Sequence, residues 1–125
     1  MKQPVFRFSD ERLTDAPYAV IESALIRMER PKAFSPWSGL ASPGMALGWV
    51  EDSIEGPKEE EGLLRLRWTA TYWGTREEGC LTVDPSGDKV HLKLEGKCRG
   101  WFVIGSIGLL SWGASRSIDR FVESL

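Results

Sequence analysis

The chain has little of the chemistry that most enzymes and metal proteins use, since it contains one histidine and two cysteines. A usual zinc site needs four ligands at defined spacings, and His91, Cys80 and Cys98 cannot supply them. A site made of carboxylates alone would need a spacing that the sequence does not show. One histidine, expected on the outer side of a strand, gives no Ser/His/Asp or Cys/His arrangement. We therefore expect no catalytic residue, no metal and no cofactor.

The chain also lacks a strong charge of either sign and a long hydrophobic run. Its formal net charge is −2, which favours no partner by itself. The apolar run at 101–114 is shorter than the roughly 18–20 residues that span a bilayer and is interrupted by glycine. No apolar stretch follows Met1, so no signal peptide is expected. These absences predict a cytoplasmic protein without a membrane span, organised as one domain over 1–125.

The pattern that is present predicts an antiparallel sheet with helices near both ends. Residues 4–9 alternate as a strand, and Asp15–Pro17 has the composition of a helix start, with an N-cap and a first-turn proline. This helix should run to about Glu29, with a further short helical turn at 32–37. Later segments alternate as strands with short connections, which favours an antiparallel meander. The expected strands are 45–54, 63–73, 78–84 and 89–98.

The same alternation gives the sheet one apolar and one polar face. Cys80 and Cys98 fall on opposite faces, which argues against a disulfide. The polar face carries five basic residues, and such a face near Trp73 could bind RNA or an acidic partner. A solvated face is the simpler interpretation, because Glu78 and Glu95 dilute the charge, and we expect no nucleic acid partner. The basic residues are Arg65, Arg67, Lys89, Lys93 and Lys97.

Acidic residues gather at 51–61, which holds six acids and one lysine. The simplest interpretation of such a run is a solvated hairpin loop. Inward acids near its start, such as Glu51 or Asp52, could still serve as a general base.

Gly100–Leu125 must supply the element that covers the apolar face of the sheet. Its first half is apolar nearly all round and its second half is amphipathic. Glycines at 105, 108 and 113 allow close approach of either the sheet or a ligand. One apolar stripe should pack on the sheet: Val103, Ile107, Leu110, Ala114, Ile118 and Phe121.

Three segments carry a resemblance to a known family: DAPYAVIESAL after the opening strand, the Pro-Trp-Ser-Gly turn at 36–39, and TVDPSGDKVHLKLEGK ahead of Gly100. In this order the chain resembles the START/polyketide-cyclase-like (SRPBCC) superfamily, which includes the major birch-pollen allergen, over essentially its whole length. The resemblance implies an α+β helix-grip fold. In that fold a curved antiparallel β-sheet wraps around a long C-terminal helix, with one or two short helices after the first strand.

The resemblance also implies a hydrophobic cavity between sheet and helix that binds lipids, polyketides or other apolar molecules. We accordingly expect a small hydrophobic or aromatic ligand there. The chain has six tryptophans, which either line such a pocket or fill the core. The expected ligand-binding residues are Trp49, Leu66, Trp68, Tyr72, Leu92, Leu94, Phe102, Leu109 and Trp112.

Two other functions stay open at this point. One is a cyclase- or dehydrase-like enzyme, which would need a carboxylate or another polar group projecting into the cavity. The other is an interaction module without ligand, in which apolar residues of 101–112 and the loop 37–49 dock a partner or form a homodimer.

Overall fold

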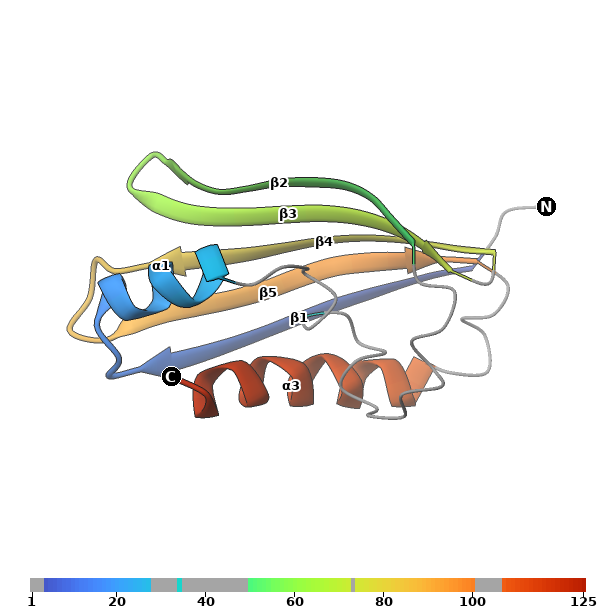
Figure 1. The fold of residues 1–125 in the computed structure, drawn as a ribbon. Helices are drawn as coiled ribbons and strands as arrows, with labels where there is room; N and C mark the ends of the chain where they lie inside the picture. Colours follow the sequence, from blue (N-terminus) through green and yellow to red (C-terminus); the bar gives the residue numbers. More distant parts are fainter. Residues whose placement is uncertain (1–3, 28–33, 35–49, 73, 101–106) are drawn as a thin grey trace.

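The structure is a computed structural model that describes residues 4–27, 34, 50–72, 74–100 and 107–125. Within these residues, five antiparallel strands form one sheet in the order β1-β5-β4-β3-β2, accompanied by helices α1 and α3 (Figure 1). The elements are β1 (Val5–Thr14), α1 (Tyr18–Arg27), β2 (Val50–Glu60), β3 (Leu63–Tyr72), β4 (Thr75–Asp84), β5 (Val90–Arg99) and α3 (Ile107–Glu123).

The sheet is the antiparallel meander that the sequence predicts, with the first strand added at its end. Strands β2, β3 and β4 each pair with the next strand in the chain, and β1 pairs with β5. The β1–β5 ladder runs from Val5 opposite Arg99 to Thr14 opposite Val90. Strand β1 therefore extends five residues beyond the predicted 4–9, because its polar second half is held by pairing rather than by burial.

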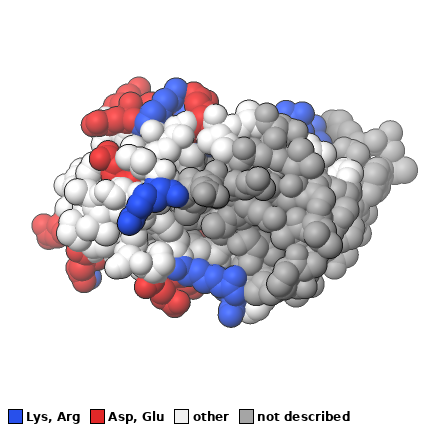
Figure 2. Space-filling view, viewed as in Figure 1, with Lys and Arg blue, Asp and Glu red and all other residues white. Residues whose placement is uncertain are grey.

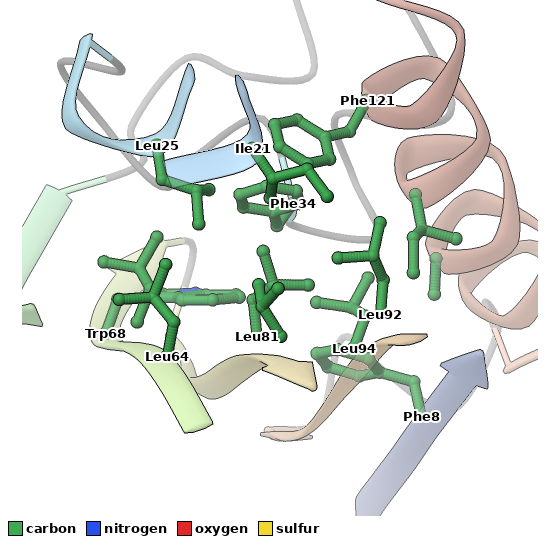
Figure 3. Packing of buried hydrophobic residues seen from close by; sticks show 14 of the residues in the cluster. Phe8, Ile21, Leu25, Phe34, Leu64, Trp68, Leu81, Leu92, Leu94 and Phe121 are labelled. Atoms are coloured by element: carbon green, nitrogen blue, oxygen red, sulfur yellow. The ribbon is translucent and has the colours of Figure 1, made fainter. Parts of the chain in front are cut away.

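The predicted alternation of apolar and polar residues in β3, β4 and β5 is confirmed. Inner-face side chains of these strands are buried, and outer-face side chains are at least partly exposed. Cys80 lies on the outer face and Cys98 is buried on the inner face, and no disulfide links them. The core joins these strands to β1, α1, Phe34 and α3 (Figure 3). Its members from the helices and Phe34 are Ile21, Leu25, Phe34, Ala114, Ile118 and Phe121.

The helix start predicted at Asp15–Pro17 agrees with α1. The amides of Val20 and Ile21, in its first turn, donate to the carbonyl oxygen of Pro17 at 3.0 and 3.2 Å. Residues 28–33 and 35–49, including most of the predicted turn at 32–37 and the strand start at 45–49, lie outside the described residues. None of the helices in the described part of the chain is both long and apolar enough to cross a membrane.

The expected helix-grip architecture is wrong, because the sheet does not wrap around a long C-terminal helix. Helix α3 lies along β1, the strand at one edge of the sheet (Figure 1). Arg12 of β1 fixes this position, donating from Nε to Asp119 Oδ1 at 2.6 Å and from Nη2 to Ser115 Oγ at 2.7 Å. Helix α1 and Phe34 share the cover of the inner face, so α3 is not enclosed by it.

The acidic run 51–61 was expected to be a solvated hairpin loop, and this expectation is wrong. The run forms most of β2 and the start of its turn to β3. Figure 2 shows acidic and basic side chains together over this hairpin. Arg67 donates to both carboxylate oxygens of Glu60 at 3.0 and 3.1 Å, and Arg65 donates to Oε2 at 3.1 Å. These hydrogen bonds, led by those from Arg67, lower the pKa of Glu60 from 4.5 to about 2.

This lowered pKa predicts an acid-sensitive contribution to stability. A carboxylate with a lower pKa in the folded protein stabilises the fold fully above its unfolded value and loses that effect as the pH falls. The window therefore runs from 4.5 down to about 2. We expect Glu60→Gln to reduce the fall in melting temperature across this window, measured by circular dichroism. Glu61→Gln, at the exposed next residue, is the control; equal pH slopes for wild type and Glu60→Gln would contradict the assignment.

Candidate functional site

The nine ligand-binding residues predicted from the sequence do not come together as one pocket wall. Four of them belong to the core, with 4% or less of their surface exposed, but β4 separates the two on β3 from the two on β5: Leu66, Trp68, Leu92 and Leu94. Trp112, in contrast, is 53% exposed on α3, where the guanidinium of Arg116 lies 5.2 Å from its ring. Tyr72 belongs to β3 and Leu109 to α3, and Trp49 and Phe102 lie outside the described residues.

The indole of Trp68 packs against bare backbone and against an aromatic ring. Its partner across β3–β4 is Gly79, and a Cβ at Gly79 would overlap the ring, so the ring covers the bare backbone there. The ring of Phe34 stacks with the indole at a centroid distance of 6.1 Å. Phe34 in turn meets Phe121 of α3 edge-on at 5.1 Å. The indole therefore links the middle of the sheet to the C-terminal helix.

Glu77 is a carboxylic acid side chain buried in this core, with no exposed surface. The indole Nε1–H of Trp68 donates to Glu77 Oε2 at 2.9 Å, and the thiol of Cys98 donates to Oε1 at 3.7 Å. Burying a carboxyl group is unfavourable unless hydrogen bonds replace its lost hydration. Glu77 thus satisfies the indole, and the indole helps to hold Glu77 in the core.

Thr75 adds a second polar group to the same face of β4. Its side chain is fully buried, and its hydroxyl has no hydrogen-bond partner among the described residues. A Cβ at Gly100, the residue after β5, would lie 2.9 Å from that hydroxyl oxygen, so the backbone there packs closely against it. A buried hydroxyl without a partner costs about 1–3 kcal/mol. Thr75, Glu77, Cys98 and the indole nitrogen of Trp68 are called the inner polar cluster below.

The inner polar cluster has the chemistry of a hydrogen-bonding anchor in an apolar setting. Glu77 offers carboxylate oxygens, and the Thr75 hydroxyl can both donate and accept. Among the described residues, no group of three or more His, Cys, Asp or Glu side chains is placed to hold a metal ion. The cluster can therefore orient a small molecule or move a proton, rather than coordinate a metal.

Glu77 was not identified from the sequence, because the strand predicted there starts at residue 78, whereas β4 starts at Thr75. Extending the inward positions Gly79, Leu81 and Val83 backwards by two residues places Glu77 on the inner face. A further signal was the short connection around Gly74, whose φ of 71° suits a tight hairpin turn. Such a turn sets the register that puts Trp68 opposite Gly79 and one step from Glu77.

Comparison with known proteins identifies the fold but not a family. No protein-family model matches the chain, and no curated protein matches it. The chain is similar to the crystal structure of a hypothetical protein, jhp0584, from Helicobacter pylori. The TM-score is 0.67 at 10% sequence identity, covering 94% of this chain and 86% of that one. A likeness at such low identity concerns the fold alone.

A weaker similarity links the chain to the crystal structure of TTHA0849 from Thermus thermophilus. It covers 97% of this chain and 95% of that one at 15% identity, with a TM-score of 0.41, which is too low to support an argument. Neither protein is described as a member of a named superfamily. The START-like resemblance therefore stays a prediction.

The contact between Trp68 and Gly79 predicts that this glycine tolerates no side chain. Gly79→Ala should lower the free energy of unfolding by about 2–3 kcal/mol, because the indole must leave its position. Urea unfolding followed by circular dichroism measures the loss. Gly87→Ala is the matched control, since its Cβ would meet only the carbonyl oxygen of Lys89 at an ordinary 3.5 Å. Equal stability of the two variants would show that the indole does not need bare backbone.

The two faces of β4 allow an equally direct test of Glu77. Glu77→Ala should lower the free energy of unfolding by about 2–4 kcal/mol, because the Trp68 N–H loses an acceptor and a void is left. Glu77→Gln keeps an acceptor oxygen and should lose less. Glu78→Ala, one residue along on the outer face, removes ion pairs of 3.4 and 3.7 Å and should change stability little. The prediction fails if the two alanine variants unfold at the same urea concentration.

Proposed function

We propose that the protein binds a small molecule on the inner face of its sheet. The ligand would have an apolar or aromatic body and at least one hydrogen-bond donor, such as an amine, a hydroxyl or an amide N–H. The observation that carries this proposal is the buried Thr75 hydroxyl, which has no partner in the described part of the chain and lies two residues from the buried Glu77 on the same face. Apolar surroundings with a few converging polar groups are typical of small-molecule sites.

Stability alone gives no reason for a threonine at position 75. A valine of nearly the same shape would fill the space without the penalty of an unpaired hydroxyl. A group retained at a cost to the fold is typical of binding and catalytic sites, where stability is given up for function. A bound ligand that hydrogen-bonds to Thr75 would remove the penalty.

The neighbouring side chains define the chemistry of the ligand. Glu77 accepts from Trp68 through Oε2 and from Cys98 through Oε1. A carboxylate accepts hydrogen bonds, so a ligand group placed beside Glu77 would meet an acceptor. The position directly across from Glu77 is apolar: Ala70, its partner on β3, has no exposed surface. A donor on a flat apolar body matches this combination.

The enzyme alternative has one specific point in its favour. Glu77 is the inward carboxyl group that a cyclase- or dehydrase-like reaction would use as a general base. The strand registers place Glu51 of β2 in the same row, because it pairs with Ala70, which in turn pairs with Glu77. Binding is our leading proposal because it rests on the Thr75 hydroxyl, and turnover would be lost in Glu77→Gln if the alternative holds. The interaction module and the homodimer stay predictions; the described surface contributes exposed Trp112 to them.

Native mass spectrometry of freshly purified protein tests the binding proposal. We expect an added mass on the wild type that is absent from Thr75→Val and Glu77→Gln. Thr75→Val should in addition melt at a higher temperature without ligand, because it removes a buried unpaired hydroxyl. Thr82→Val and Glu78→Gln make the same substitutions on the outer face of β4 and should keep the added mass.

Two results would overturn the proposal. One is a wild-type protein that carries no added mass and shows no thermal shift with aromatic amines and alcohols. The other is a Thr75→Val variant that keeps the ligand at full occupancy, since the hydroxyl would then play no part in binding.

A further inference from the structure

The outer face of the sheet, called the open face here, is covered by neither described helix. Both α1 and α3 pack on the opposite, inner face (Figure 3). The residues of the open face follow from the strand registers, in which each strand contributes every second side chain. Charged and hydroxyl side chains occupy most of these positions. By the strand registers, no Phe, Tyr or Trp of the described residues occupies an outward position.

Like charges stand directly opposite each other at one end of the open face. Arg7 of β1 pairs with Lys97 of β5, and in the next row Arg99 of β5 pairs with Arg76 of β4. Like charges at directly opposed positions destabilise a sheet. These four residues are called the basic corner, and the fold alone gives no reason to keep them together.

One acid only partly neutralises the basic corner. Glu78 lies 3.4 Å from Lys97 and 3.7 Å from Arg76, with all three side chains partly exposed. Arg7 and Arg99 form no ion pair with any residue in the described ranges, and both are exposed. The corner therefore keeps an excess of positive charge.

The rest of the open face does not share this excess. Glu60 binds Arg65 and Arg67, and Lys93 lies 3.9 Å from Glu95. Each of these three cations has an acid within 4 Å, whereas Arg7 and Arg99 have none among the described residues. We therefore expect an anion to bind at the basic corner rather than elsewhere on the open face.

The surface beside the corner is hollowed. A hollow of about 690 Å³ has four basic and two acidic residues in its wall, with small polar side chains between them. The charged residues are Arg7, Arg65, Arg67, Lys97, Glu78 and Glu95, and the small polar ones are Ser9, Cys80 and Thr82. A second, of about 270 Å³, is lined by Arg76, Glu78, Lys97 and Arg99. The two share Glu78 and Lys97, so they adjoin. The larger volume is within the range of small-molecule sites, roughly 300–1,000 Å³.

We propose that the basic corner and its hollow bind an organic polyphosphate of nucleotide size. The phosphates lie against the four cations, because arginine and lysine donate charge-assisted hydrogen bonds to phosphate oxygens. The organic part lies in the larger hollow, where Ser9 and Thr82 offer hydroxyls. Bound phosphate also removes the repulsion within the corner. This site lies on the face opposite the inner polar cluster and does not depend on the function proposed there.

A single-stranded nucleic acid fits this surface less well. Sequence-independent binding of single strands combines a basic groove with aromatic side chains on which bases stack. Phe8 and Trp68 line hollows of the open face but are only 4% and 2% exposed, so they offer no ring for stacking. Acids at Glu95 and Glu60 also interrupt the positive charge of this face. A discrete polyphosphate needs only the corner.

Titration of the labelled protein with ATP, without divalent metals, tests the proposal by NMR. We expect saturable shifts in β1, β4 and β5 around the basic corner, weakening as salt is raised. Arg7→Ala, Arg99→Ala and Lys97→Ala should each weaken ATP binding about tenfold, as for loss of one charge-assisted hydrogen bond. Lys93→Ala, two rows along the same strand and face, is the matched control and should change affinity less than about twofold.

Stability separates a binding role from a structural one. Arg99→Ala removes one partner of a like-charge pair, so its melting temperature should be unchanged or higher while its ATP affinity falls.

Tripolyphosphate tests the contribution of the organic part of the ligand, and we expect it to bind more weakly than ATP. ATP should also slow alkylation of Cys80, which lines the larger hollow, by N-ethylmaleimide. Cys98 is fully buried and should not react in the folded protein.

Four results would overturn the proposal. ATP could fail to shift the corner at low salt, or Lys93→Ala could weaken binding as much as Lys97→Ala. ATP and tripolyphosphate could bind equally, which would remove the role of the hollow. An oligothymidylate could bind more tightly than ATP at equal salt, which would identify the surface as a nucleic acid site.

Discussion

The position of one indole, that of Trp68, constrains much of this molecule. Its bulk is accommodated because Gly79 has no side chain, its N–H requires an acceptor, and its ring requires a packing partner. Glu77 supplies the acceptor and Phe34 supplies the partner. Phe34 in turn contacts Phe121, so the packing around Trp68 extends to the C-terminal helix. A buried polar atom and a helix position thus follow from one large side chain in the middle of a sheet.

The place of α3 follows from what the centre of the inner face already holds. Phe34 and the buried side chains of α1, Ile21 and Leu25, pack over that centre. The amphipathic half of α3 therefore finds its apolar contacts nearer the edge, where Ala114 and Ile118 are fully buried. Arg12 then fixes the helix along β1 through Asp119 and Ser115. A narrow sheet shared between two helices has no need to curve around either of them.

Sequence patterns were sufficient where structure is local and insufficient where it depends on a distant partner. The two-residue period of Leu64, Leu66 and Trp68 determined the inner face correctly, because the pleat allows no other arrangement. The role of Glu60 could not be read in this way, since its run of acids resembles a solvated loop until Arg65 and Arg67 lie beside it. The buried state of Glu77 depends similarly on the Trp68 N–H across the ladder. The sequence pattern indicates which residues face inward, but it does not show which residues lie opposite each other on neighbouring strands, and the environments of Glu60 and Glu77 depend on that register.

Strand β4 concentrates the two unusual features of the molecule within four consecutive residues. Thr75 and Glu77 point inward into an apolar core, while Arg76 and Glu78 point outward into the basic corner. On the inner face a hydroxyl stays unpaired within the described part of the chain, and on the outer face Arg76 stands opposite Arg99. Each arrangement lowers stability, and elsewhere the strand has ordinary alternation, with Leu81 and Val83 buried. Because selection for folding alone would favour neither feature, the start of β4 is where we expect function to have shaped the sequence, on both faces at once.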